Sequence, residues 1–168
     1  MISAFRPRRT AFYSLLALFT VLFFRGNLAS VFPAVLLVMA VHGWESYYRA
    51  DMDRIFGKAD YGPGDKSSLL RLSCLLATLA VAGAFYFGLA VWYVPLTFLA
   101  FFGAWLSHQV QFASDFLLSF SFTGMLLAHS ADPLALAPLY WFVFFRELGL
   151  RSISQLSRPF GMENFNLT

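Results

Sequence analysis

The sequence predicts an all-α fold, a polytopic transmembrane helical bundle of about six spans, and three observations lead to that prediction. Of the 168 residues, 59% are hydrophobic and only 12% are charged, and the mean hydropathy of +0.65 lies far from the balance of a water-soluble domain. Apolar segments alternate with short polar breaks along the whole chain. Lys and Arg fall almost entirely in every second break. We therefore expect a single integral membrane domain over 1–168.

Six apolar segments are long enough to be spans, since the shorter ones are tolerated inside a bundle. They cover residues 10–24, 28–44, 69–89, 92–106, 112–129 and 133–150. A turn signal at Arg25-Gly26-Asn27 ends the first, a polar insert over 45–68 follows the second, and Gly88 ends the third before Trp92-Tyr93 opens the fourth. Asp132-Pro133 opens the last span.

The distribution of basic residues predicts the orientation. With the N-terminus in the cytoplasm, eleven of the twelve Lys and Arg residues are cytoplasmic: Arg6, Arg8, Arg9, Arg49, Arg54, Lys58, Lys66, Arg71, Arg146, Arg151 and Arg158. Only Arg25 lies on the opposite side. We expect a protein of the bacterial inner (cytoplasmic) membrane with both termini, the insert 45–68 and the C-terminal segment 151–168 in the cytoplasm. The clustered charge indicates anionic lipid as a partner and no nucleic acid.

Two stretches carry a family resemblance. ESYYRADMDRI (45–55), with the KADYGPGDKSS that follows, resembles the first signature of the UbiA superfamily of intramembrane prenyltransferases, which reads Asn-Asp-x-x-Asp-x-x-x-Asp. FFRELGLRSISQLSR, through its Arg146-Glu147 step, is similar to the end of the family's sixth helix. The resemblance aligns the chain with the first six of nine helices and implies a UbiA-like fold from which the last three are missing.

In active members of this family, both Asp-rich motifs hold Mg²⁺, which bridges to the diphosphate of an isoprenyl donor. Mg²⁺ prefers oxygen ligands, and it neutralises the diphosphate as the allylic carbon ionises. In this chain Glu45, Ser46 and Arg49 stand where the family has Asn, Asp and Asp, and only Asp53 is kept. The second motif has basic or neutral residues at its acidic positions: Arg151, Ser154 and Arg158. These departures predict the loss of Mg²⁺-dependent ionisation.

Two interpretations of the motif residues stay open. Glu45 and Asp53, with Asp51, form a reduced metal site, or they pair with neighbouring basic side chains on a solvated helix end. Arg49, Arg151 and Arg158 form a metal-free anion or diphosphate site, or they anchor to lipid headgroups. No catalytic residue is assigned, and Mg²⁺ is a cofactor only if the protein is an active prenyltransferase.

The function predicted from these residues is that of a UbiA-prenyltransferase-like pseudoenzyme, a non-catalytic accessory subunit of a membrane complex that binds an isoprenoid or lipid. Other membrane subunits or further copies of the chain are the expected partners. The alternative is an active prenyltransferase that moves an isoprenyl group from a prenyl diphosphate to an aromatic or other lipophilic acceptor. Phe-rich segments are candidates to line an isoprenoid groove: Phe101, Phe116, Phe120 and Phe122.

Overall fold

A computed structural model describes residues 5–23, 27–55, 65–89, 91–130 and 132–156, with the side chains of 51–55, 65 and 151–156 excepted. Six α-helices and one 3₁₀ turn make up the regular structure of these residues, which confirms the all-α prediction. The elements are α1 (Pro7–Phe23), η2 (Leu28–Ser30), α2 (Val31–Ile55), α3 (Asp65–Tyr86), α4 (Tyr93–Leu106), α5 (Gln111–Leu127) and α6 (Pro133–Leu156).

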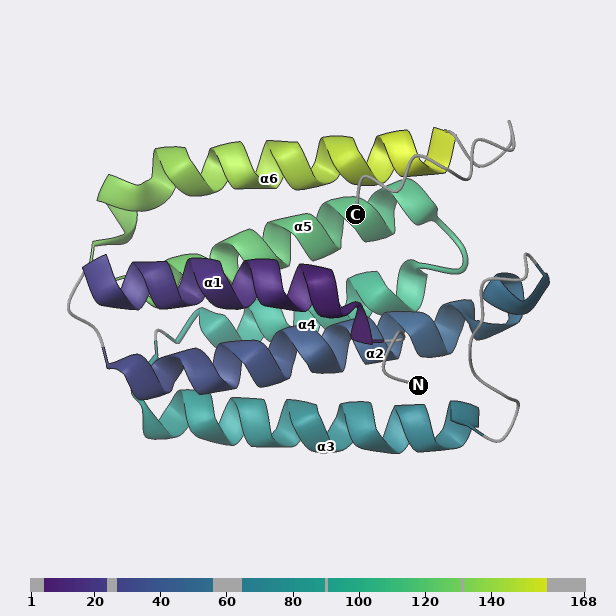
Figure 1. Ribbon diagram of the computed structural model, residues 1–168, viewed down its shortest axis with the longest axis horizontal. Helices are drawn as coiled ribbons and strands as arrows, with labels where there is room; N and C mark the ends of the chain where they lie inside the picture. Colours follow the sequence, from purple (N-terminus) through teal and green to yellow (C-terminus); the bar gives the residue numbers. More distant parts are fainter. Residues whose placement is uncertain (1–4, 24–26, 56–64, 90, 131, 157–168) are drawn as a thin grey trace.

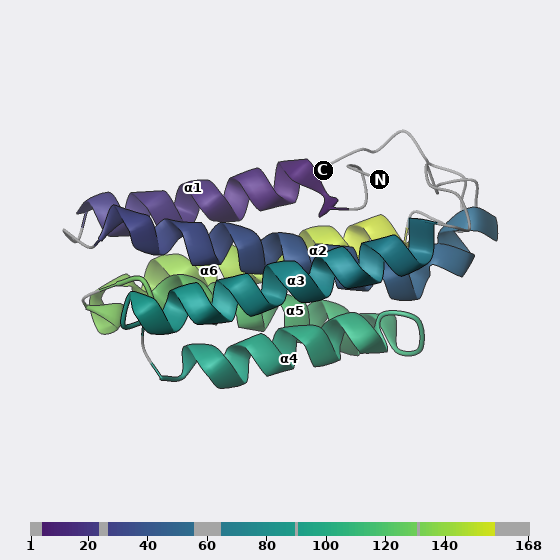
Figure 2. The same cartoon turned by 90° about the horizontal axis from the view of Figure 1, so that it is seen from below.

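The six helices run up and down between two ends of one elongated bundle (Figure 1). Helices α2 and α5 are central, α3 packs chiefly on α2, and α6 packs chiefly on α5. Helix α1 covers one side of this arrangement and α4 covers the other (Figure 2). The alternation places the starts of α1, α3 and α5 with the ends of α2, α4 and α6 at one end of the bundle.

The turns form where the sequence predicts breaks. The Asn27 side chain accepts a hydrogen bond of 3.0 Å from the backbone N–H of Ala29, which turns the chain into η2. Gly88 follows α3 with φ of +66°, in the left-handed region that favours glycine. The Asp132 side chain accepts a hydrogen bond of 3.2 Å from the N–H of Ala135 and so caps α6, with Pro133 in its first turn.

Small residues bring α4 and α5 close together. A Cβ atom on Gly103 would lie 2.9 Å from Leu117 Cβ and 3.3 Å from the backbone nitrogen of Leu118. Gly124, on α5, faces Leu96 of α4, whose side chain would lie 2.7 Å from an added Cβ. The approach of the two helices therefore requires glycine at position 103, whereas at Gly124 the end of the Leu96 side chain can move aside.

Helix α2 extends beyond the second predicted apolar segment. Helix α2 does not stop at Trp44 but continues to Ile55, so more than half of the polar insert 45–68 is helical at its two ends. Glu45 is completely buried and Arg49 is 6% exposed, so these two residues do not lie on a solvated helix end. The helix continues because charged side chains do not disrupt the backbone hydrogen bonds of a helix. Glu45 and Arg49 form an ion pair across one helical turn.

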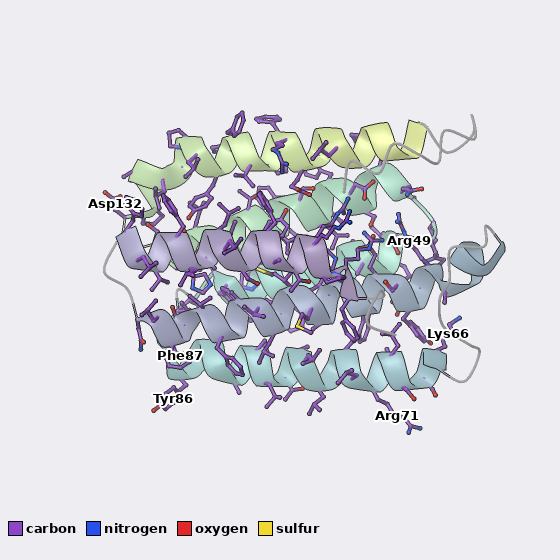
Figure 3. All side chains as sticks on the ribbon, viewed as in Figure 1. Arg49, Lys66, Arg71, Tyr86, Phe87 and Asp132 are labelled. Atoms are coloured by element: carbon purple, nitrogen blue, oxygen red, sulfur yellow. The ribbon has the colours of Figure 1, made fainter. Side chains whose placement is uncertain are left out.

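The described basic side chains gather toward one end of the bundle, which we call the basic end. Figure 3 labels Arg49, Lys66 and Arg71 in that half, while Tyr86, Phe87 and Asp132 lie toward the opposite end. This separation follows from the up-and-down order, because basic residues flank every second connection in the sequence.

Among the described residues, two helical stretches are long and apolar enough to cross a membrane, Leu28–Ala50 and Lys66–Tyr86, and a third apolar stretch, Tyr93–Leu106, is shorter. Helices α1 and α5 have 17 residues each and α4 has 14, below the length of about 20 that crosses hydrocarbon without adjustment. A buried core helix of a water-soluble protein meets the same criteria. Length and apolar composition are thus shared by membrane spans and by buried core helices.

Candidate functional site

A buried carboxylate is the centre of the polar site at the basic end. Glu45 lies on α2, and its side chain is fully enclosed. Arg49 Nη1 lies 3.4 Å from Glu45 Oε1, and Arg6 Nη1, from the segment before α1, lies 3.2 Å from Glu45 Oε2. Two guanidinium groups from different parts of the chain thus neutralise one carboxylate.

The two guanidinium groups differ in how deeply they are buried. The Arg49 side chain is 8% exposed, whereas that of Arg6 is 26% exposed and reaches the surface. His42 is fully buried one turn earlier on α2, with Nδ1 3.6 Å from Glu45 Oε2 and its ring 5.3 Å from the ring of Phe122. Because charge in a low-dielectric interior needs a partner, burial favours the close pairing of Glu45 with Arg49.

Two further carboxylates are buried in helices at the same end. Asp115 lies in the second turn of α5 and is 3% exposed, and Glu147 lies on α6 and is 5% exposed. Arg146 Nη1 lies 3.4 Å from Glu147 Oε1, and the Arg146 guanidinium stands over the ring of Phe12 at 5.1 Å. The Arg146-Glu147 step that carries the second part of the resemblance therefore joins α6 to α1.

The described residues around Glu45 do not fit Mg²⁺. Mg²⁺ prefers about six oxygen ligands in octahedral geometry, several of them waters. Among the residues whose side chains the structure describes, no three His, Cys, Asp or Glu residues gather as a metal site. A cation on Glu45 would also stand beside two guanidinium groups, which repel it. Asp53, the other predicted metal ligand, has a side chain outside the described set.

Of the three arginines predicted to form an anion site, the structure describes the side chain of Arg49 only. Arg49 is enclosed and ion-paired with Glu45, while the Arg151 side chain and the whole of Arg158 lie outside the described residues. The structure brings Arg49 together with Arg6 instead. From the sequence, Arg6 contributes only to the predicted orientation, and no sequence signal joins it to Glu45, because 39 positions separate the two in the chain.

A second polar group lies nearer the opposite end. The side chains of Tyr93 and His129 are buried, and their rings approach edge to face at 6.1 Å. His129 Nδ1 lies 3.5 Å from the hydroxyl of Ser30, at the limit of a hydrogen bond. Tyr93 and His129 border a small cavity that Tyr13 and Phe122 also line. Aromatic and polar side chains thus occupy the interior along much of the bundle.

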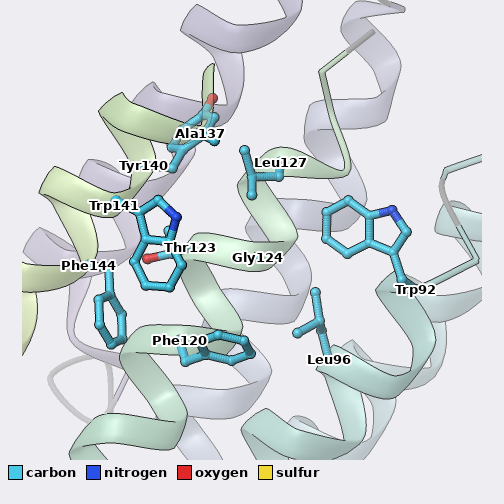
Figure 4. Close-up of a pocket in the computed structure, with 10 residues that line it drawn as sticks. All are labelled: Trp92, Leu96, Phe120, Thr123, Gly124, Leu127, Ala137, Tyr140, Trp141 and Phe144. Carbon is cyan, nitrogen blue, oxygen red and sulfur yellow. The ribbon is translucent and has the colours of Figure 1, made fainter. Parts of the chain in front are cut away.

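An apolar groove of about 320 Å³ opens between α4, α5 and α6 (Figure 4). Its lining is almost wholly hydrocarbon or aromatic: Trp92, Leu96, Phe120, Thr123, Gly124, Leu127, Ala137, Tyr140, Trp141 and Phe144. Of the four Phe residues predicted to line an isoprenoid groove, Phe120 lines this apolar groove. Phe116 stacks beside Phe120, Phe122 is in the core, and Phe101 packs on Trp44.

Comparison of the chain with protein-family models, curated proteins and solved structures finds no match.

Proposed function

We propose that this chain is an integral membrane protein of six spans, similar to UbiA prenyltransferases in its motif spacing, that acts as a non-catalytic accessory subunit of a membrane complex. The observation that carries the non-catalytic assignment is the ion pair of Glu45 and Arg49. At the motif positions where the family has Asn and Asp, this chain has Glu45 and Arg49, and these two side chains pair with each other.

The side-chain distribution supports the membrane assignment. Many of the largest exposed residues are aromatic or aliphatic, including Phe85 at 70%, Phe98 at 71% and Phe142 at 68% exposure. These three lie on three different helices, so the apolar surface extends around the bundle. Meanwhile Glu45 and Asp115 are buried inside. Apolar residues outside and paired charges inside suit a hydrocarbon surrounding, because extensive exposed apolar surface is disfavoured in water.

The charge distribution supports the orientation. Arg49, Lys66 and Arg71 lie toward the basic end, and by the positive-inside rule we propose that this end faces the cytoplasm. The short helices α1, α4 and α5 are accommodated by local thinning of the bilayer or by packing within the bundle. The membrane that we propose is the bacterial inner membrane.

The edge helices support a partner. Helices α3 and α6 each pack chiefly on one neighbour, so each leaves much of its surface for another subunit, a further copy of the chain or lipid. The accessory role predicts that the protein migrates as part of a larger assembly after extraction in mild detergent. Migration as an isolated monomer would contradict that role.

The decisive experiment is turnover of a radiolabelled prenyl diphosphate by membranes that contain the protein, with an aromatic acceptor and Mg²⁺. We expect no Mg²⁺-dependent transfer above that of membranes lacking the chain. Transfer that requires Mg²⁺ and is lost in Asp53→Ala would refute the non-catalytic assignment and establish the prenyltransferase alternative. Carbonate extraction of the same membranes tests insertion separately, since a spanning protein stays in the pellet.

A further inference from the structure

Tyr93 and His129 place two polar atoms in the interior of the bundle. Tyr93 is 2% exposed and His129 is 6% exposed. Among the described residues, neither the hydroxyl oxygen of Tyr93 nor Nε2 of His129 has a hydrogen-bond partner. The two rings meet edge to face with their centroids 6.1 Å apart, so these residues are neighbours. Because a buried polar group without a hydrogen bond costs free energy, the two atoms point to a bound partner.

The two ring nitrogens of His129 have different surroundings. Nδ1 lies 3.5 Å from the hydroxyl of Ser30. A neutral imidazole has one donor and one acceptor nitrogen, so Nε2 can form a hydrogen bond whichever nitrogen carries the proton. The Tyr93 hydroxyl can both donate and accept. A single small molecule that also donates and accepts would satisfy Nε2 and the Tyr93 hydroxyl together.

A cavity of about 10 Å³ lies against both side chains. Its lining comes from α1, α2, α4 and α5, with His129 in the turn that follows α5. Each lining residue is buried, with at most 7% exposure. The cavity therefore lies among core residues, which are Tyr13, Ala34, Val38, Tyr93, Phe122, Met125, Leu126 and His129.

The size and the lining of this cavity select water. One water molecule requires about 10–15 Å³ of such space, so the cavity is at the lower limit for a single water and too small for a larger ligand. The lining contains no Asp, Glu, Lys or Arg, so it offers a metal cation only neutral ligands. A wholly apolar cavity stays dry, but two tyrosines and a histidine border this one.

We propose that one water molecule binds in this cavity and bridges the hydroxyl of Tyr93 to Nε2 of His129. The hydroxyl of Tyr13, on α1, is the third polar side-chain group of the lining. Tyr93 begins α4 and His129 follows the end of α5, so the water joins the start of one helix to the turn after the other. The inference concerns the interior of the bundle and is independent of membrane insertion and of enzyme activity.

The test detects water at His129 by nuclear magnetic resonance in the folded full chain, with ¹⁵N-labelled histidine. Polarisation is transferred from water protons to the ring nitrogens of the three histidines. Replacement of His42 and His108 by Gln, one at a time, assigns the signals. His108 is exposed and provides the positive control. We expect transfer both to His108 and to Nε2 of His129. Transfer to His108 without transfer to His129 would overturn the proposal.

Tyr93→Phe removes the bridging hydroxyl and fills no space. It should lower transfer to Nε2 of His129 by about threefold or more, because the water then loses one of its few polar partners. Tyr140→Phe is the matched control: it also removes a buried tyrosine hydroxyl, but that hydroxyl is bonded directly to Thr20 and lies outside the cavity lining. It should leave the transfer unchanged. An equal fall in both variants would overturn the specific bridge.

Two more variants keep the test decisive. Ala34→Val fills the cavity from α2 and gives a second reading if Tyr93→Phe does not fold. Ser30→Ala removes the other exchangeable proton near the ring, which lies at Nδ1. Persistence of the transfer to Nε2 in Ser30→Ala is expected for a bound water, and its loss would trace the signal to the Ser30 hydroxyl. Unchanged transfer in both Tyr93→Phe and Ala34→Val would overturn the assignment of water to this cavity.

Discussion

Removal of the Glu45 carboxylate is the sharpest test of the buried ion pair. Glu45→Gln keeps the shape and most of the volume of the side chain but removes its negative charge. Arg49, whose side chain is 8% exposed, then loses its ion-pair partner at 3.4 Å, and Arg6 loses its partner at 3.2 Å. We expect a large loss of stability that comes mainly from Arg49.

The magnitude follows from the geometry. Two unit charges 3.4 Å apart attract by about 5 kcal/mol at an effective dielectric constant of about 20. Desolvation offsets part of this attraction, and truncation of one partner of a buried pair costs about 3–5 kcal/mol. Arg6 contributes less because its side chain is about one quarter exposed and solvent screens it. We therefore expect the free energy of unfolding to fall by about 3 kcal/mol.

A double-mutant cycle isolates the pair. Glu45→Gln combined with Arg49→Met removes both charges, and it should recover most of the loss because no unpaired charge is then buried at these two positions. Unfolding in mild detergent by added sodium dodecyl sulfate, followed by Trp fluorescence, gives the free energies, with Trp44 adjacent to the site. Asp132→Asn is the control, since it removes an exposed charge but keeps a capping side chain. A coupling energy below about 0.5 kcal/mol would refute our reasoning about the pair.

Two further predictions concern packing and orientation. Gly103→Ala should lower the free energy of unfolding by about 1–3 kcal/mol, because its Cβ would press on α5. Gly149→Ala is the control: no described atom lies within 4 Å of its Cβ, so this change should be neutral or stabilising by up to about 1 kcal/mol. Equal effects of the two substitutions would contradict the close approach of α4 to α5 at Gly103. The orientation is tested with a membrane-impermeant thiol reagent in a Cys74→Ser background. The reagent should label Lys66→Cys only from the cytoplasmic side and Asp132→Cys only from the opposite side. Labelling of both cysteines from one side would rule out the proposed orientation.

The helices could be predicted from the sequence because their breaks are local. Asn27, Gly88 and Asp132 each act on residues within a few positions, so the composition near them indicates where a helix begins or ends. The first segment was expected over 10–24 and α1 covers Pro7–Phe23. Hydropathy does not predict the last residue of α2, because it measures the preference for an apolar surrounding and not the continuity of the helix.

The site could be predicted only in part, because its main contacts join distant positions. The i, i+4 spacing of Glu45 and Arg49 is visible in the sequence, and pairing of the acids with basic residues was one of two interpretations. The contribution of Arg6 depends on how α1 packs beside α2, which no local pattern encodes. Burial of both Glu45 and Arg49 was likewise hidden, because a charged run is ordinarily a solvated surface.

The spacing of the motif has a meaning that does not depend on metal. Residues four apart lie on one face of a helix, so the positions of Glu45, Arg49 and Asp53 face the same way whatever side chains they carry. Two acidic side chains on this face would repel each other and would need a bound cation between them. With Glu45 and Arg49, the guanidinium of Arg49 supplies the positive charge. A guanidinium thus performs the neutralisation that Mg²⁺ would supply, but it cannot be exchanged and does not bridge to a diphosphate. The same helix geometry is therefore compatible with a metal site or with a closed ion pair, and in this protein the described side chains form the ion pair.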